Sequence, residues 1–303
     1  MLPFYFSKGC TMEQFIQFLI NGIAIGSIYA LMTVGYSLVY SIMNFSNFAH
    51  GGVIMVGSYF GFFAITILRA PFWLALLIAM TGTMLLAIVI ERLAYDPLRR
   101  RKAPALYYII SAMGISIFLE NFVLATLGAD FRNYPALFDS PAINIGNLSI
   151  GKLDLLILVV GAISLFGLMY LIEKTKIGLA IRATSFNLRA SNLMGVNTEL
   201  VIFVVFGLGG LLAGLAGVMY GLRYTVWPQM GLITNKAFVA AVFGGLGSLP
   251  GAIVGAIALG IIEVMATGYI SSNLKDLIAF VVLILVLVIR PSGIMGKATE
   301  DKA

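Results

Sequence analysis

Two carboxylic acids that interrupt long apolar runs are the residues of this sequence best suited to chemistry. Glu120, followed by Asn121, lies inside the run 105–127, and Glu263 lies inside the run 250–269. A carboxylate at the centre of a membrane-spanning helix costs about 3 kcal/mol unless it faces a cavity or a partner. Each acid is therefore predicted to have one of two roles. It is either a group that lines or gates a pathway through the membrane, or it takes part in a hydrogen bond between helices, made by the protonated acid or by Asn121.

Two connections between apolar runs carry no formal charge: NFSNFAHGG at 44–52 and GGLGSLPG at 244–251. Irregular backbone at membrane depth is tolerated only where it is buried in protein or lines a cavity. We therefore interpret both connections as breaks in helices that are entered from outside and return outside, and as candidate equivalent parts of an internal repeat. Their candidate pathway residues are Asn44, Asn47, His50 and Gly247.

A break in a helix offers binding groups to a small solute. Its free N–H groups and positive helix end attract a carboxylate, whereas its unwound carbonyls attract an ammonium group. A zwitterionic amino acid suits both ends, although urea and other small polar solutes suit the same geometry. Ser46 and Asn47 could instead only cap the helix that begins near Gly51.

Signatures of catalysis and of nucleotide binding are missing from the sequence. The closest approach to a phosphate-binding loop, GIMGKA at 293–298, lacks the required spacing and has Ala298 where Ser or Thr must reach magnesium. The single cysteine, Cys10, and the single histidine, His50, lie at opposite ends of the first apolar run. Hydrolysis by a serine with His50 has no GxSxG elbow or HExxH helix to support it. We predict no catalytic residue, no metal site and no cofactor.

The composition defines the setting of these residues. The chain is 60% hydrophobic and 11% charged, with a mean hydropathy of +1.02, whereas soluble domains are about 25% charged. These values predict an integral membrane protein. The net charge of +6 does not predict nucleic-acid binding, because the basic residues gather at the ends of apolar runs.

The apolar runs predict an all-α polytopic membrane protein with about eight transmembrane helices. The predicted spans are 14–41, 51–68, 72–95, 105–127, 153–173, 199–222, 250–269 and 276–290. A ninth run, 236–247, is too short to cross and is predicted to be re-entrant. Rows of small residues at helix-interface spacing, such as Gly22 with Gly26 and Gly210 with Gly214, predict tight helix packing.

Three basic clusters orient the chain. They follow the third, fifth and last apolar runs, at 92–102, 174–189 and 290–302. Placing all three in the cytoplasm predicts an external N-terminus and a cytoplasmic C-terminus, and it leaves the more acidic interval 129–154 outside.

The interval 174–197 has the pattern of a basic amphipathic helix rather than that of a loop. Its apolar residues are interleaved with lysines and arginines, among them Arg182 and Arg189, and no acid occurs between Glu173 and Glu199. The stretch is too polar to span a bilayer. We therefore predict a helix at the cytoplasmic surface that docks on a cytoplasmic partner.

Four stretches of the sequence together resemble one family of transport proteins. They are NGIAIGSIYALMTVGYSLVYSIMNFSNFAHGGVIMVG (21–57), ERLAYDPLRRRKAPALYYIISAMGISIFLEN (91–121), TKIGLAIRATSFNLRASNLMGVN (175–197) and AAVFGGLGSLPGAIVGAIALGIIE (240–263). They resemble the H-type permease subunit of branched-chain amino acid ABC importers. The resemblance implies a transmembrane permease domain at 12–296, an N-terminal extension at 1–11 and a cytoplasmic tail at 297–303. Urea and amide permeases resemble the same stretches, so urea and amides are the alternative substrate class.

The resemblance also implies partners and a coupling site. The partners are cytoplasmic ATP-binding subunits, a homologous second permease subunit, an external solute-binding protein and the lipid bilayer of the inner membrane, with no nucleic acid. RASNLMG, 189–195, resembles the EAAxxxG coupling motif, which Ala190 and Gly195 match and from which Arg189 and Ser191 depart. The expected coupling residues are Arg182, Arg189, Ala190, Ser191 and Gly195.

An alternative of a different class is a secondary transporter that works alone on an ion gradient. In that case Glu120 and Glu263 would be the coupling groups, because they are the acids at membrane depth.

Overall fold

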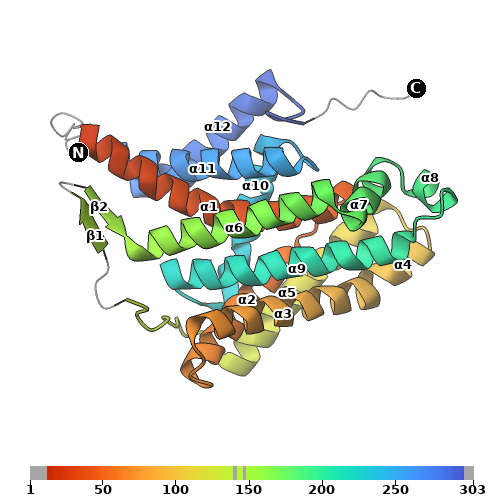
Figure 1. Ribbon diagram of the computed structural model, residues 1–303, viewed down its shortest axis with the longest axis horizontal. Coiled ribbons are helices and arrows are strands. Elements are labelled where there is room, and N and C mark those ends of the chain that lie inside the picture. Colours follow the sequence, from red (N-terminus) through yellow and green to blue (C-terminus); the bar gives the residue numbers. More distant parts are fainter. Residues whose placement is uncertain (1–11, 139–141, 146–147, 297–303) are drawn as a thin grey trace.

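The computed structural model describes residues 12–138, 142–145 and 148–296, and almost all of its regular structure is helical (Figure 1). Within this part of the chain, eight helical stretches are long and apolar enough to span a membrane. They are α1 (Met12–Met43), α2 (Ala49–Thr66), α3 (Phe72–Ile90) with its continuation into the π-helix η1 (Glu91–Tyr95) and α4 (Asp96–Arg100), α5 (Ala105–Leu127), α6 (Lys152–Lys174), α9 (Thr198–Arg223), α11 (Leu249–Tyr269) and η3 (Ser272–Leu274) with α12 (Lys275–Ile289). The prediction of an all-α polytopic membrane protein is confirmed.

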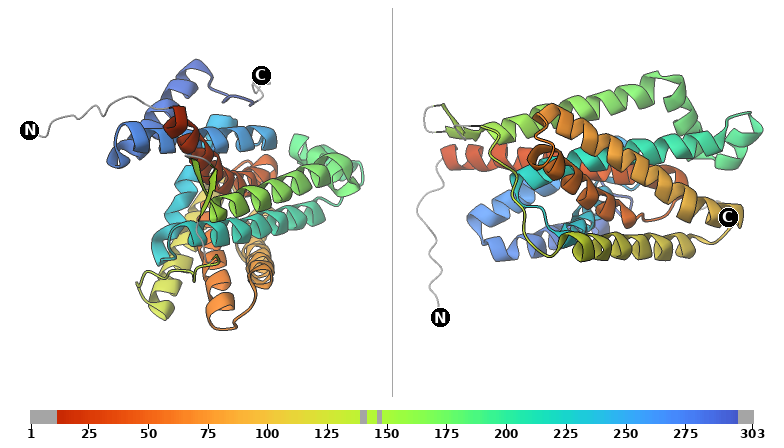
Figure 2. Two further views of the ribbon diagram at one scale, coloured as in Figure 1. Left: turned by 60° about the vertical axis from the view of Figure 1, so that its left-hand side comes forward. Right: turned by 90° about the horizontal axis from the view of Figure 1, so that it is seen from below.

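Shorter elements connect these spans. They are β1 (Ala142–Ile145) and β2 (Leu148–Gly151), which form one antiparallel hairpin, the helices α7 (Lys176–Phe186) and α8 (Leu188–Leu193), the 3-10 helix η2 (Pro228–Ile233) and α10 (Thr234–Gly244). The hairpin lies at one end of the bundle and α8 lies at the other, and we call these the hairpin end and the α8 end (Figures 1 and 2).

Local sequence explains where several helices begin. Pro71 and Pro104 directly precede α3 and α5 with extended backbone angles, as expected where proline restricts the chain before a helix. Ser248 and Asn197 cap α11 and α9, because their side chains accept hydrogen bonds from the backbone N–H groups of Gly251 and Leu200.

The predicted rows of small residues lie at helix interfaces. A Cβ atom on Gly26 would come within 2.7 Å of the Cα atom of Ile257, and one on Gly260 would come within 2.5 Å of the Cα atom of Gly26. A Cβ atom on Gly214 would likewise come within 2.7 Å of the carbonyl oxygen of Ala79. Thus α1 packs backbone to backbone on α11, and α9 packs in the same way on α3, which confirms the predicted role of these rows.

The first uncharged connection is a true break inside the protein. After α1 ends at Met43, the chain turns back, and Phe45 is 2% exposed against the rings of Tyr95 and Tyr108. By His50 the chain has returned to the level of Met32, whose carbonyl oxygen lies 3.1 Å from His50 Nε2. Helix α2 therefore starts in the interior, as predicted for 44–52.

The second uncharged connection differs from its prediction. Residues 245–248 form a turn at the α8 end, where a Cβ atom on Gly247 would lie 3.7 Å from Tyr40 and Ser41 of α1. Leu246 in this turn is 37% exposed. Because both uncharged connections adjoin the end of α1 opposite to Met12, they cannot be entered from outside if the N-terminus is external. That part of the topology prediction was wrong.

A break inside the protein lies earlier in the chain than this turn, at 224–233. Because of this break, the chain crosses the helix bundle a ninth time. Val226 pairs with Arg132 close to the hairpin end, where the two backbones exchange hydrogen bonds of 2.9 Å. The 3-10 helix η2 then packs on the first turn of α2, where Gly231 and Thr234 lie against Gly51. Helix α10 continues to the α8 end, so the run 236–247 completes a crossing and is not re-entrant as predicted.

This ninth crossing resolves a conflict in the predicted topology. Eight complete spans would place both ends of the chain on one side of the bilayer, which does not agree with an external N-terminus and a cytoplasmic C-terminus. In the structure Met12 lies at the hairpin end, whereas the backbone N–H groups of Ile294 and Met295 bond to the carbonyls of Phe243 and Gly244 at the α8 end.

The hairpin end is held together by polar contacts. Gln17 of α1 donates a 2.7 Å hydrogen bond to the carbonyl oxygen of Ser149 in the hairpin, and Arg223 of α9 forms a 2.8 Å ion pair with Asp154 of α6. Tyr134 donates a hydrogen bond of 2.7 Å to the carbonyl oxygen of Ser58. Burial raises the pKa of the Tyr134 hydroxyl, so this group stays protonated as a donor.

Candidate functional site

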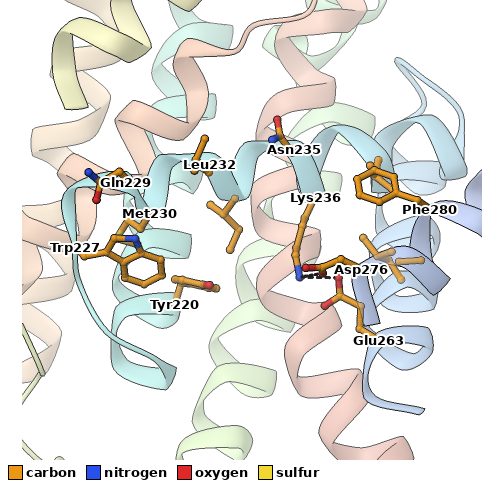
Figure 3. A pocket seen from close by; sticks show the side chains of 14 residues that line it. Tyr220, Trp227, Gln229, Met230, Leu232, Asn235, Lys236, Glu263, Asp276 and Phe280 are labelled. Atoms are coloured by element: carbon orange, nitrogen blue, oxygen red, sulfur yellow. Dashed lines mark hydrogen bonds and ion pairs between the residues drawn. The ribbon is translucent and has the colours of Figure 1, made fainter. Parts of the chain in front are cut away.

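A cavity of about 330 Å³ opens where η2, α10, α11 and α12 meet the end of α9 (Figure 3). Most of its wall is apolar or aromatic. The lining residues are Tyr220, Trp227, Gln229, Met230, Leu232, Ile233, Asn235, Lys236, Val239, Leu259, Glu263, Asp276, Ala279 and Phe280. This volume lies at the lower end of the range found for small-molecule sites.

One side of the cavity carries a compact charged cluster. The Lys236 ammonium lies 2.8 Å from Glu263 Oε1 and 3.0 Å from Asp276 Oδ1. The Tyr29 hydroxyl donates a 2.7 Å hydrogen bond to Glu263 Oε2 and lies 3.3 Å from the Lys236 ammonium. Four helices, α1, α10, α11 and α12, therefore meet at one cation. Figure 3 shows Lys236 directed toward both acids, with Trp227 and Tyr220 on the opposite side of the cavity.

Helix positions explain why these four side chains meet. Lys236 lies in the first turn of α10. Asp276 lies in the first turn of α12, where the helix dipole favours its negative charge. Glu263 lies one turn beyond Gly260, at the contact of α11 with α1, so its carboxylate reaches Tyr29. The small residues at this contact thus position the cluster.

The two acids of the cluster have different surroundings. The side chain of Glu263 is 7% exposed, whereas that of Asp276 is 56% exposed. One lysine and two acids leave the cluster with one excess negative charge when all three are ionised. The Lys236–Glu263 pair is the fixed part of the cluster, because separating a buried pair leaves an uncompensated charge. The Asp276 carboxylate is the accessible part.

Of the predicted pathway residues, only Glu263 reaches this cavity. Asn47 and His50 lie together elsewhere, in the interior beside Phe206 of α9, and are 6% and 3% exposed. Asn47 Oδ1 accepts a 2.8 Å hydrogen bond from the Tyr95 hydroxyl. Asn47 does not accept a capping hydrogen bond at the start of α2, so it is not the cap that the sequence suggested.

The remaining predicted pathway residues are dispersed. Asn44 is exposed after the end of α1, with a φ of 53°, and Gly247 lies in the turn before α11. Glu120 is half-buried on α5, and Asn121 is exposed and donates a 2.8 Å hydrogen bond to the carbonyl oxygen of Ile117 in its own helix. The structure therefore does not join Glu120 and Glu263 into one site.

Sequence reasoning missed three members of the cluster, Tyr29, Lys236 and Asp276. A usable signal was present for one pair. Lys236 is the only basic residue between Arg223 and Lys275, and Glu263 is the only acid between Glu199 and Asp276. A single cation and a single acid in apolar surroundings are expected to pair, because each is costly alone.

The amphipathic stretch 174–197 forms a separate feature at the α8 end. It folds as two helices, α7 and α8, rather than as one, because Thr175 and Asn187 each cap a new helix start. Their side chains accept hydrogen bonds from the N–H groups of Gly178 and Ala190. Arg182 donates a hydrogen bond to the carbonyl oxygen of Ile172, at the end of α6.

The expected coupling residues occupy the exposed part of this feature. Arg189, Ala190 and Gly195 are exposed, whereas Ser191 is buried. Gly195 has a φ of 86°, and no atom lies within 4 Å of the position its Cβ would take. Three large apolar side chains of α7, α8 and the turn that follows α8 are uncovered: Phe186, Leu193 and Met194 are 91%, 88% and 85% exposed. We call these three the α8 apolar tip.

Side chains that bind metal ions would have to lie close together in the folded chain. Among the described residues, no group of three His, Cys, Asp or Glu side chains lies close enough to hold a metal ion.

Comparison with known proteins shows that nearly the whole chain is similar to one protein family. Residues 18–287 match the family model described as branched-chain amino acid transport system / permease component. The chain is 39% identical to the high-affinity branched-chain amino acid transport system permease protein LivH of Salmonella typhimurium, over 96% of this chain and 99% of that protein. It is 38% identical to BraD of Pseudomonas aeruginosa, over 95% and 98%, and 28% identical to a probable LivH of Methanocaldococcus jannaschii, over 91% of each.

Proposed function

Because this chain belongs to the family of branched-chain amino acid transport permease components, we propose that it is the membrane-spanning subunit of an ATP-driven importer of branched-chain amino acids. In this role it forms half of the translocation pathway. The observation that carries the proposal is similarity over nearly full length to permeases whose names state this transport activity.

The energy for transport comes from partner subunits. The sequence lacks a phosphate-binding loop, so ATP hydrolysis is assigned to cytoplasmic ATP-binding subunits and this chain is assigned no catalysis. The other proposed partners are a homologous second permease subunit, which supplies the other half of the pathway, and an external solute-binding protein. The multi-pass chain would reside in the inner membrane with its hairpin end outside and its α8 end in the cytoplasm.

The coupling contact is proposed at α7 and α8. Exposed Arg182, Arg189, Ala190 and Gly195 and the α8 apolar tip support this assignment, and Ser191 supports the turn from inside. An uncovered apolar tip beside basic residues suits a cleft in a partner. Because α7 and α8 connect α6 with α9, a movement of the docked segment would be transmitted to both spans.

The pathway residues are assigned by their positions. Glu263 is proposed to face the solute in the outer half of the protein, through the cavity that it lines. Asn47 and His50 are proposed to support the deep break between α1 and α2. Asn44, Glu120, Asn121 and Gly247 stay predicted pathway residues that lie at the ends of the bundle or on the surface of α5.

The alternatives are less well supported. A urea or amide permease does not fit the names of the most similar relatives compared above. A secondary transporter with Glu120 and Glu263 as joint coupling groups finds no support in the geometry, because only Glu263 lines the cavity.

Uptake by the complete complex tests the proposal. The chain should be co-produced with its partner subunits and reconstituted in vesicles with the solute-binding protein. We expect uptake of L-leucine, L-isoleucine and L-valine that requires ATP and is unaffected when the proton gradient is dissipated. Leucine uptake that persists without ATP and collapses with the proton gradient would refute the importer assignment.

A further inference from the structure

We propose that the Lys236–Asp276 ion pair and the adjoining apolar cavity form a binding site in this permease for a zwitterionic α-amino acid with an apolar side chain. The inference rests on the proposed transport function. It assigns the recognition of the solute's charged groups to residues of the permease itself, at the outer half of the bundle.

The polar half of the site is built from groups that match both charges of the solute. The Lys236 ammonium lies 3.0 Å from the exposed Asp276 carboxylate, while its other carboxylate partner, Glu263, is buried and also bonded to Tyr29. Lys236 can therefore exchange Asp276 for another carboxylate while it keeps its bond to Glu263. Asp276, once released, is a free acceptor for an ammonium group.

Insertion of a zwitterion into this pair conserves charge. The carboxylate of the solute would bind Lys236, and its ammonium group would bind Asp276, so one ion pair is replaced by two. A neutral amide or urea cannot make this exchange, because it has no charged group that could form an ion pair with Lys236 or with Asp276. A solute with only one of the two charges would form one ion pair where a zwitterion forms two, because it could bind Lys236 or Asp276 but not both.

The apolar half of the site is continuous with the charged pair. Leu232, Ile233, Val239, Leu259 and Phe280 line the cavity next to Lys236, and Trp227 and Tyr220 lie on its opposite side (Figure 3). A branched aliphatic side chain placed there would remove apolar surface from water on both the solute and the protein. A charged side chain would find no group of opposite charge in this wall other than those of the cluster itself.

A purely structural role for the ion pair does not explain the exposure of Asp276. An ion pair exposed on one side contributes at most about 1 kcal/mol to stability, and Lys236 is already bonded to Glu263 at 2.8 Å. The accessible second acid and the adjoining cavity are explained together if a ligand takes part in the cluster.

Tryptophan emission gives a direct readout of binding. The chain has two tryptophans, and Trp73 is exposed on α3, so the Trp73→Phe protein carries Trp227 in the cavity as its single reporter. We expect a saturable change in emission with L-leucine. 4-Methylpentanoic acid, which lacks the amino group, isopentylamine, which lacks the carboxylate, and urea should each require about tenfold or higher concentration.

The Asp276→Asn variant tests the charge exchange without disturbing the buried pair. Binding and ATP-dependent uptake of leucine should fall by about tenfold or more, and leucine should lose its advantage over 4-methylpentanoic acid. The matched control is Asp130→Asn, an exposed acid in the loop after α5, which should leave both measurements unchanged. Lys236→Gln should also lose leucine binding, and its thermal stability must be measured alongside.

The two proposals fail in different ways. If the wild-type complex does not import leucine with ATP, the transport assignment is wrong. If it does, but Asp276→Asn imports leucine as well as wild type and still prefers leucine to 4-methylpentanoic acid, the binding site lies elsewhere. An absent Trp227 response in a Trp73→Phe protein that still transports leucine would also overturn the site.

Discussion

Tyr95 donates a 2.8 Å hydrogen bond to Asn47, and this contact joins the π-helix at the end of the third span to the irregular segment between α1 and α2. Both residues are buried, and Tyr95 also packs on Phe45 within that segment. A π-helix is a rare departure from regular helix that is frequent at functional sites. The contact holds two irregular segments of the membrane domain against each other.

Removing this hydrogen bond should destabilise the protein. In Tyr95→Phe the buried Oδ1 atom of Asn47 loses its donor, which costs about 1–3 kcal/mol for an unsatisfied acceptor. The midpoint of thermal unfolding in detergent should fall. The matched control, Tyr107→Phe, changes a tyrosine that is 56% exposed and should have no effect. Equal midpoints for both variants would show that the Tyr95 bond contributes nothing.

Replacing one partner of the Lys236–Glu263 pair should be more harmful than replacing both. Lys236→Met leaves Glu263 without its cation, which should lower the free energy of unfolding by about 3–5 kcal/mol. The double variant Lys236→Met, Glu263→Gln removes the uncompensated charge and keeps an acceptor for Tyr29, so it should recover much of this loss. Thermal unfolding of both purified variants measures the difference. Additive losses would contradict the pairing.

The contact between α1 and α11 should not tolerate a side chain at Gly260. Gly260→Leu would force apart two helices that touch through their backbones, so the chain should not purify as a monodisperse protein. Gly167→Leu on α6 is the control, because no atom lies within 4 Å of the Cβ position there. Size-exclusion chromatography of both variants tests the contact, and a well-behaved Gly260→Leu protein would disprove it.

Gly195 should be required for its backbone conformation. Its φ of 86° is unfavourable for β-branched residues and is better tolerated by asparagine, and the space for a side chain is open. Gly195→Asn should therefore retain more leucine-stimulated ATP hydrolysis in the complete complex than Gly195→Val. If valine serves as well as asparagine, the positive φ is not what matters, and contact with the partner becomes the explanation.

The α8 apolar tip should be needed for binding to the ATP-binding subunits. Leu193→Glu with Met194→Glu should abolish their copurification without lowering the thermal stability of the permease, because both side chains are exposed. The same double change at Ile67 and Leu68, which are 70% and 68% exposed at the hairpin end, is the control. Normal copurification with the α8 variant would rule out this tip as the docking contact.

Sequence patterns predict the spans and one site residue well. Apolar length marks eight spans, because backbone groups in a bilayer must be satisfied within helices. The buried acid Glu263 stands out because a charge is costly in an apolar run. The break at 44–52 is visible because its backbone must be buried in protein.

The break at 224–233 was missed for a physical reason. The predicted spans leave 223–235 as a connection, but hydropathy does not show that Met230 and Ile233 in this connection pack inside the protein. Its hydrogen bonds are made with distant partners, such as Arg132, that sequence periodicity does not reveal. Likewise, Asp276 becomes part of the cluster only because α12 folds back beside α10.

The pairing of Ile294 and Met295 with the end of α10 has a consequence for biogenesis. The last carbonyl groups of a helix have no partner within it, and those of Phe243 and Gly244 receive their donors from residues that leave the ribosome some fifty positions later. These two hydrogen bonds therefore cannot form during insertion of the earlier spans. The C-terminal end of α10 is thus completed only after α11 and α12 have been made.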